Sequence, residues 1–408
     1  MSEWKKINMK GNIDILTGYA FSSSNFNDEE GIPLIRIRDL ETHNPKTLYK
    51  GNYDDKYIIN KGDILIGMDG EFNTVRWKGP KSLLNQRVAK IKSLNPHIIN
   101  NEFIFYRLQI ELKKIESLTP ATTVKHLSKK DIENLTLILP PEQEQRKIAA
   151  ILSSVDEAIE KTKAIIEQTE KVKKGLMQQL LTKGIGHTKF KKTEIGEIPE
   201  EWEVKTLGEL LKLKGGFAFK SSDFVEKGDI PVLRISNIKN NYIDLSDAVY
   251  VTNEVANSLN EYLLRENDIV IAMSGATTGK IGRIEKKDIP VLLNQRVGLF
   301  KIYQESTLSN DFLYYFAQSK HFQSSVGLNA IGGAQPNISG KQIESVKIGL
   351  PSFEEQQQIS LILSNIDKKL ANEEQRLIQF QAIKKGLMQV LLTGKVRVKV
   401  DEDEGTSS

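Results

Sequence analysis

The stretch Leu83-Leu84-Asn85-Gln86-Arg87-Val88 occurs a second time, unchanged, at residues 292–297. Another stretch, Lys173-Lys174-Gly175-Leu176-Met177-Gln178, is repeated in the same way at residues 384–389. Repetition at long spacing indicates that one structural unit is present more than once. These two pairs therefore predict that the chain of 408 residues contains two copies of one scaffold.

The spacing between matching residues increases along the copies. Arg36 matches Arg234 after 198 residues, and Arg87 matches Arg296 after 209 residues. From Leu127 onward the spacing is 211 residues, so the second copy has 13 more residues than the first (211 less 198), distributed over several loops. A shared framework that carries different loops favours two related tasks on two different targets.

Composition restricts the class of protein. Hydrophobic residues make up 39% of the chain and charged residues 27%, a balance typical of globular domains. No apolar run approaches the roughly 20 residues that span a bilayer, and the N-terminus lacks the pattern of a signal peptide. The absence of cysteine excludes disulfides and thiolate metal sites and predicts a cytoplasmic location. A net charge of +4 is compatible with a nucleic-acid partner.

Each copy begins with a mixed region and ends with a long helical region. Short β-branched runs, such as residues 32–37, 63–67 and 268–272, are bounded by turn-forming residues and predict strands. A proline precedes each long helical region, as is common at helix starts. The predicted division is residues 1–141 and 200–351 as mixed domains, 142–182 and 352–395 as long helices, 183–199 as a linker and 396–408 as a disordered tail.

Apolar residues in both long helical regions recur at alternating steps of four and three. This 3.5-residue period is typical of a coiled-coil seam. Polar residues interrupt it at Thr162, Thr169 and Lys173, and again at Glu373 and Lys384. The apolar seam positions are Ile148, Leu152, Val155, Ile159, Ile166, Leu176 and Leu180, and then Ile359, Leu363, Ile366, Leu370, Leu377, Phe380, Leu387 and Leu391.

The connectivity predicts how these helices pair. The first helix leaves the first domain, and the short linker 183–199 obliges it to end at the second domain. A second helix that packs on the same seam then returns antiparallel. The predicted fold class is α+β, with two pseudo-twofold-related mixed α/β domains joined by an antiparallel pair of long coiled-coil helices. In the alternative, each helix packs on its own domain.

Several segments resemble the specificity subunits of type I restriction–modification systems. Residues 193–202 resemble the usual start of a target-recognition domain in that family, as does the pattern of residues 62–65 followed by 85–87. Residues 335–339, followed by the Leu-Pro and Glu-Glu-Gln-Gln segments, resemble the junction with a spacer helix. The repeated Lys-Lys-Gly-Leu-Met-Gln box resembles the conserved regions of the family. The resemblance covers residues 1–395.

The resemblance implies a non-catalytic subunit of a restriction endonuclease and adenine methyltransferase complex. Each domain would read one half of a split double-stranded DNA site, and the helices would set the gap. Two DNA-adenine methyltransferase subunits would dock on the chain, and restriction–translocase subunits would join that complex. Methyl donor and ATP would bind those partners, so no cofactor is expected here. A coiled-coil scaffold that holds two protein partners without reading DNA is the alternative.

Some candidate DNA contacts are shared by both copies. Arg, Asn and Gln side chains can read purines, but residues that are identical in both copies suit phosphate contact or structural hydrogen bonds better than the choice between two different half-sites. Arg38 of the first copy corresponds to Ser236 of the second, at the end of the same predicted strand. Because this position differs between the copies, it is the better candidate for reading a base. The shared candidates are Arg36, Asn85, Gln86, Arg87, Arg234, Asn294, Gln295 and Arg296.

Other candidates come from loops that differ between the copies. These loops are polar and are built on glycine or proline turns, and ordinary solvated loops are the alternative. The candidates in the first copy are Asn73, Arg76, Lys78, Thr122, Thr123, Lys125 and His126. The candidates in the second copy are Asn237, Ser274, Thr277, Thr278, Lys280, Gln335 and Asn337.

Catalytic and metal sites are not expected. The run Gly275 to Ile281 departs from the phosphate-loop pattern in its glycine spacing and in the residue after lysine, and the five histidines show no metal spacing. A second apolar stripe of Ile151, Ile165 and Leu181 beside the seam predicts a surface for the methyltransferase subunits.

Overall fold

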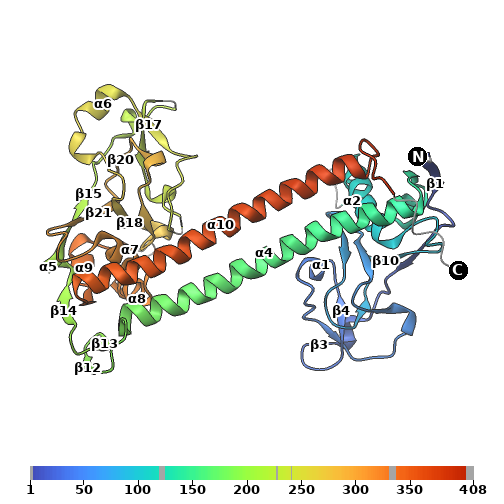
Figure 1. Ribbon diagram of the computed structural model, residues 1–408, viewed down its shortest axis with the longest axis horizontal. Coiled ribbons are helices and arrows are strands. Elements are labelled where there is room, and N and C mark those ends of the chain that lie inside the picture. Colours follow the sequence, from blue (N-terminus) through green and yellow to red (C-terminus); the bar gives the residue numbers. More distant parts are fainter. Residues whose placement is uncertain (1–2, 119–124, 227, 240, 330–336, 401–408) are drawn as a thin grey trace. The chain divides into compact units, whose positions relative to one another are not determined.

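The computed structural model describes residues 3–118, 125–226, 228–239, 241–329 and 337–400 (Figure 1). The chain forms two compact units, Met1–Lys163 with Gln375–Ser408, and Ala164–Glu374. Each unit contains one mixed domain, the start of one long helix and the end of the other. Thr122, Thr123 and Gln335 lie outside the described residues.

The first unit is built around a four-stranded antiparallel sheet. Its order is β2 (Ile13–Thr17), β10 (Val88–Ser93), β7 (Ile64–Gly67) and β8 (Thr74–Arg76). A five-stranded sheet has the order β3 (Phe26–Asn27), β5 (Leu48–Tyr49), β4 (Ile32–Ile35), β9 (Ser82–Leu84) and β6 (Ile58–Ile59). β1 (Lys5–Asn8) pairs with β11 (Thr136–Leu139). The helices are α1 (Asp39–Thr42), α2 (Asn101–Leu118) and α3 (Lys129–Glu133).

Strand β7 is buried on both faces and separates two hydrophobic clusters. Ile64 and Ile66 belong to a cluster with Phe103 of α2. Leu65, between them, belongs to a second cluster that contains Trp77. Because side chains alternate along a strand, one continuous apolar run supplies both sides of the core.

The second unit repeats this plan. Its four-stranded sheet has the order β15 (Leu211–Gly215), β21 (Val297–Ile302), β18 (Ile269–Ala272) and β19 (Ile281–Arg283). The smaller sheets are β17 (Val249–Val251), β16 (Ile230–Leu233) and β20 (Leu292–Leu293), then β14 (Glu203–Thr206) with β22 (Lys347–Leu350), and β12 (Phe190–Thr193) with β13 (Gly196–Pro199). The short helices are α5 (Leu207–Leu210), α6 (Asn253–Asn257), α7 (Asn310–Gln318), α8 (Lys320–Asn329) and α9 (Gly340–Glu344). The prediction of two copies of a mixed α/β scaffold is confirmed.

Two long helices follow the mixed domains, α4 (Glu142–Lys183) and α10 (Phe353–Leu391). Each is followed by a glycine in the left-handed region, Gly184 at φ 65° and Gly394 at φ 74°, a common way to end a helix. In the first unit the start of α4 and the end of α10 share one hydrophobic cluster (Figure 1). In the second unit the end of α4 shares a cluster with the start of α10. Within each unit, therefore, the two helices run antiparallel.

The seam positions lie inside these helix pairs. The start of each long helix also packs on its own mixed domain. Each unit therefore contains both of the contacts that were weighed as alternatives, helix against helix and helix against its own domain. The buried seam residues are Ile148, Leu152, Ile159, Leu180, Ile359, Leu363 and Leu391, and the half-buried ones are Val155, Ile166, Leu176, Ile366, Leu370, Leu377, Phe380 and Leu387.

A buried glutamine fixes the start of each long helix to its domain. Gln145 donates from Nε2 to the carbonyls of Ile98 and Pro140, each at 2.8 Å, and accepts from the Asn100 backbone N–H at 2.8 Å. Gln356, 211 residues later, makes the same three types of bond at the start of α10, with the carbonyls of residues 307 and 351 and the N–H of residue 309. Each helix direction is thus set by its own domain.

Candidate functional sites

Two loops that are distant in sequence meet in the first unit. Asp69 and His126 form an antiparallel bridge, and Met68 connects this bridge to Arg87 through a backbone hydrogen bond of 2.9 Å. Gly70 follows Asp69 at φ 74°, a left-handed conformation that glycine adopts without strain. The loops that the sequence analysis treated separately are therefore one surface.

The side chains of Asp69, Arg87 and His126 form what is called here the Asp69 cluster. The Asp69 carboxylate lies 3.2 Å from a guanidinium nitrogen of Arg87 and 2.6 Å from Nδ1 of His126. The second distance is that of a hydrogen bond, so Nδ1–H of His126 donates to Asp69. Asp69 is largely covered, with 20% of its side chain exposed, whereas Arg87 and His126 are about half exposed.

The second unit presents three other side chains on the same backbone, the Ser274 cluster of Ser274, Arg296 and Asn337. Ser274 and Asn337 form the equivalent bridge, and the Met273 N–H donates to the Arg296 carbonyl at 3.0 Å. Arg296 and Asn337 are exposed. The Ser274 hydroxyl is buried and has no hydrogen-bond partner among the described residues.

The repeated Asn-Gln-Arg stretch is held against the residues that directly follow β2 in the first unit and β15 in the second. The Gln86 N–H donates to the Tyr19 carbonyl at 2.9 Å, and the Gln295 N–H donates to the Phe217 carbonyl at 2.8 Å. A Cβ on Gly18 would lie 2.0 Å from the Asn85 carbonyl oxygen, so this approach requires glycine there. The repeated stretch is therefore a structural support from which the exposed side chains of Gln86 and Gln295 project.

Several predicted contacts point into the protein, which corrects the expectation that they face DNA. Arg76 pairs with Glu102 and lies 4.9 Å above the Phe105 ring, which fixes β8 to α2. Asn85 is buried, and Asn237 is fully buried and donates to the Asp244 carbonyl. Arg76 and Asn237 thus hold their own domains together, whereas the buried Oδ1 of Asn85 has no hydrogen-bond partner among the described residues.

Other predicted contacts are engaged on the surface or in loops. Lys78 pairs with Glu160 at 2.9 Å, and Lys125 donates to the Glu116 carbonyl at 2.7 Å. Arg234 donates to the Asp247 carbonyl at 3.1 Å. The Arg36 guanidinium stacks over the Phe26 ring at 5.0 Å, and the Thr278 hydroxyl donates to the Gly275 carbonyl. Further predicted contacts are half-buried, namely Asn73, Thr277, Lys280 and Asn294. Arg38 and Ser236 are exposed, as the sequence analysis requires of a base-reading pair.

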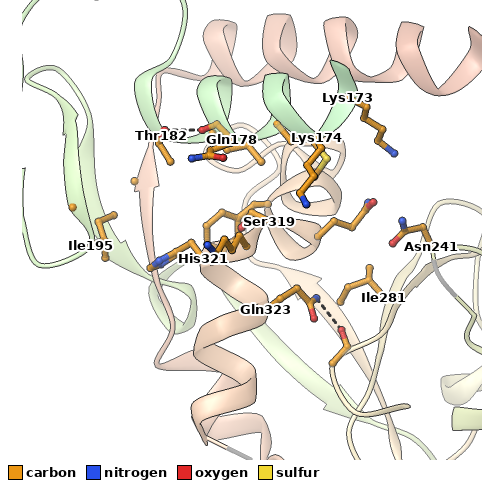
Figure 2. Close-up of a pocket in the computed structure, with 18 of the residues that line it drawn as sticks. Lys173, Lys174, Gln178, Thr182, Ile195, Asn241, Ile281, Ser319, His321 and Gln323 are labelled. Carbon is orange, nitrogen blue, oxygen red and sulfur yellow. Dashed lines mark hydrogen bonds between the residues drawn. The ribbon is translucent and has the colours of Figure 1, made fainter. Parts of the chain in front are cut away.

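Each unit contains a cavity lined by the repeated Lys-Lys-Gly-Leu-Met-Gln box. In the second unit a cavity of about 790 Å³ is lined by Lys174, Met177 and Gln178 (Figure 2). Figure 2 shows Lys174 and Gln178 of α4 on one side, with His321 and Gln323 of α8 opposite. In the first unit a cavity of about 1000 Å³ is lined by the matching residues Lys385, Met388 and Gln389. We call these the box cavities.

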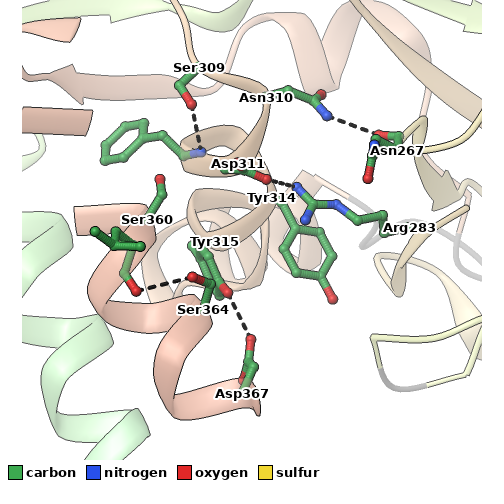
Figure 3. Close-up of polar contacts among 12 residues, drawn as sticks. Asn267, Arg283, Ser309, Asn310, Asp311, Tyr314, Tyr315, Ser360, Ser364 and Asp367 are labelled. Atoms are coloured by element: carbon green, nitrogen blue, oxygen red, sulfur yellow. Dashed lines mark hydrogen bonds and ion pairs between the residues drawn. The ribbon is translucent and has the colours of Figure 1, made fainter. Parts of the chain in front are cut away.

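The two lysine interruptions of the seam, Lys173 and Lys384, are paired within their own units. Lys173 forms an ion pair with Asp367 at 2.6 Å. Figure 3 shows the Tyr315 hydroxyl, which donates to the same carboxylate at 2.8 Å. The first unit repeats this arrangement with Lys384, Asp156 and Tyr106, at 2.6 and 2.7 Å. Burial, followed by the neighbouring Asp367 charge, raises the pKa of the Tyr315 hydroxyl, which therefore remains a donor at neutral pH. These are the Lys-Asp-Tyr triads.

Among the residues that the structure describes, no group of three or more His, Cys, Asp or Glu side chains could hold a metal ion. None of the helices in that part of the chain is long and apolar enough to cross a bilayer. Of the second apolar stripe, Ile151 and Ile165 are exposed, whereas Leu181 is buried against the second domain. Leu181 is therefore not available to a partner, which corrects the prediction that all three residues form a partner surface.

Comparisons with known proteins agree with this architecture. A family profile described as the type I restriction modification DNA specificity domain matches residues 1–171 and 199–382. The chain is 36% identical to the type I restriction enzyme MjaVIII specificity subunit of Methanocaldococcus jannaschii, over 84% of this chain and 81% of that protein. It is 31% identical to the EcoBI specificity subunit of Escherichia coli, over 87% and 77%.

A solved structure has the same fold. The crystal structure of the type I restriction-modification system S subunit from M. genitalium matches with a TM-score of 0.60. The match covers 98% of this chain and 97% of that one at 19% sequence identity. At this level of identity the similarity concerns the fold.

Proposed function

Because the chain belongs to the family of type I restriction–modification DNA specificity subunits, we propose that each mixed domain reads one half of a split DNA site. The domains are residues 1–141 and 200–351. The observation that carries the proposal is that one backbone arrangement presents different exposed side chains in the two units, the Asp69 cluster and the Ser274 cluster. A single scaffold with two different loop surfaces suits a site with two unlike halves.

The long helices are proposed to set the gap between the half-sites. Fixed spacing of two readers fixes the spacing of the sequences that they contact. Gln145 and Gln356 hold each helix start to its domain, and the Lys-Asp-Tyr triads allow one register of the helix pair within each unit. A buried polar group in a coiled-coil seam specifies register because a shifted register would leave it unpaired.

The box cavities are proposed as docking sites for two methyltransferase subunits. The loops of the two units differ, but the boxes are identical, and identical sites suit two copies of one partner. Each cavity combines lysine heads with an apolar floor, which suits a segment with both acidic and apolar side chains. Exposed Ile151 in the first unit and exposed Ile165 in the second are further candidate partner contacts, each within its own unit. Restriction–translocase subunits would join through that complex.

The chain is proposed to have no catalytic role of its own. Methyl transfer and ATP hydrolysis would take place on the partner subunits in the cytoplasm, with their own cofactors. This chain would supply the choice of sequence and the spacing. Candidate DNA contacts that the structure leaves exposed are Arg38, Lys78, Gln86, Arg87 and His126, and then Ser236, Gln295, Arg296 and Asn337.

The experiment is to express this chain with the methyltransferase subunit of its own system in a host whose DNA carries no adenine methylation. Base modifications are then mapped over the host genome. The expected result is one motif with two unlike halves and a fixed gap, which disappears when this gene is omitted. Methylation at an uninterrupted motif, or methylation that persists without this chain, would contradict the proposal.

A further inference from the structure

We propose that the Asp69 and Ser274 clusters are specificity-determining sites, at which the first domain selects a guanine and the second an adenine. This inference rests on the proposed function, since it assumes that both domains read DNA. It concerns which base two particular positions select. The positions 69, 87 and 126 of the first copy correspond to 274, 296 and 337 of the second.

The backbone at both clusters is the same. Met68 accepts from the Leu127 N–H at 2.7 Å, and Met273 accepts from the Ile338 N–H at 2.9 Å. The bridges and the bond to the arginine carbonyl are also shared. Differences between the clusters are therefore differences of side chain on a fixed frame. A fixed frame lets two side chains alter the choice of base without rebuilding the domain.

In the first unit the arginine is held by a carboxylate. Asp69 lies 3.2 Å from the Arg87 guanidinium and is itself held by His126. Asp69 offsets the charge of Arg87 and would repel a nearby phosphate, so this arginine is less suited to a purely electrostatic contact. A guanidinium in a fixed orientation can donate to O6 and N7 of guanine together, the commonest specific contact of arginine.

In the second unit that carboxylate is replaced. Ser274 stands in the place of Asp69, so the charge beside Arg296 is absent at this position. Arg296 therefore suits a phosphate, which attracts a full positive charge. Asn337 stands in the place of His126 and is exposed. Its amide both donates and accepts, and this pair of groups matches N6 and N7 of adenine.

The different surroundings of Arg87 and Arg296 change the interpretation of these two shared arginines. Identity of Arg87 and Arg296 suggested that they contact phosphate or serve structure in both copies. The structure shows that the identical arginines have different immediate neighbours, because Asp69, 18 positions before Arg87, and His126, 39 positions after it, both reach Arg87. A shared side chain can then have two roles, one in each domain.

The test exchanges the chemistry of the two clusters. The double variant Asp69→Ser and His126→Asn is expressed with the methyltransferase subunit, and methylation is measured on a library of split sites with each half randomised in turn. We expect the half-site of the first domain to lose its preference for guanine at one position by about 5- to 150-fold. The other half-site and the gap should stay as in the wild type. The reciprocal variant Ser274→Asp with Asn337→His is the matched control and should alter the other half-site alone.

The outcomes separate this inference from the proposed function. Unchanged half-sites in variants that still methylate would overturn the inference and leave the function standing. A wild-type complex that methylates no split site would overturn the function itself. Should a double variant fail to fold, as judged by circular dichroism, the single variant Asn337→Ala decides. It should lose the adenine preference by a similar factor, and retention of that preference would refute the assignment.

Discussion

Lys173 on α4 and Asp367 on α10 form an ion pair of 2.6 Å. The equivalent pair in the first unit is Lys384 with Asp156, where the lysine lies 211 residues after Lys173 and the aspartate 211 residues before Asp367. Each lysine occupies a position where the heptad pattern calls for an apolar side chain. Each aspartate also accepts from a tyrosine of the adjacent domain. One polar triad thus connects both helices and the domain within its own unit.

Replacement of Lys173 by Met should destabilise the protein. The change leaves the Asp367 carboxylate half-buried without its cation, which we expect to lower the free energy of unfolding by roughly 1–3 kcal/mol. The measurement is urea denaturation followed by circular dichroism. Lys174→Met, at the exposed neighbouring position, is the control and should have little effect. Equal losses for the two variants would show that the pair contributes nothing.

The buried glutamines should be essential to the attachment of the long helices. Gln145→Leu leaves two carbonyls and one N–H without the partner they have now, and we expect a loss of about 1–3 kcal/mol. Gln143→Leu, on the exposed side of the same turn, should be close to neutral. Thermal unfolding of both variants measures the difference. Identical melting temperatures would contradict the structural role.

Obstruction of the box cavities should reduce the number of bound methyltransferase subunits stepwise. Gln178→Trp and Gln389→Trp each place a large ring in one cavity. Native mass spectrometry should show one methyltransferase subunit on either single variant and none on the double variant. Gln168→Trp, an exposed position of α4 that lines neither cavity, should retain two. Two bound subunits on the double variant would place the docking surface elsewhere.

Stability should decrease at acidic pH through Glu144. Burial alone would raise the pKa of this carboxyl, but hydrogen bonds from Arg397 and the Val398 N–H outweigh burial and lower it below the ordinary value of 4.5. A lowered folded-state pKa adds stability above the unfolded value, and this stability is lost as the pH falls through the folded-state pKa. Urea denaturation between pH 6 and pH 3 should show a steeper loss for the wild type than for Arg397→Met. Parallel curves would exclude this linkage.

Local patterns in the sequence were enough for the architecture. The repeated stretches predicted two copies, and the 3.5-residue spacing predicted two long helices, because identities and spacings along the chain can be recognised without any knowledge of tertiary contacts. The same reasoning left Lys173 and Lys384 as unexplained interruptions. Their partners lie on another helix, so only the packed structure identifies Asp367 and Asp156.

The candidate DNA contacts were less predictable. Residue type alone made Arg76 and Asn237 resemble DNA-reading residues, but the first is fixed to α2 and the second is fully buried. Asp69 is not among the residues predicted from the sequence, and its importance comes from its contact with Arg87, which only the folded structure shows.

The sequence by itself therefore determined the duplication, the alternation of mixed domains with long helices, and the seam, because each follows from residue identities and spacings along the chain. Tertiary structure alone decided which side chains are exposed, which arginines are already paired and which loops meet. Those properties depend on contacts such as that between Asp69 and His126, which form only when chain segments far apart in sequence fold against each other.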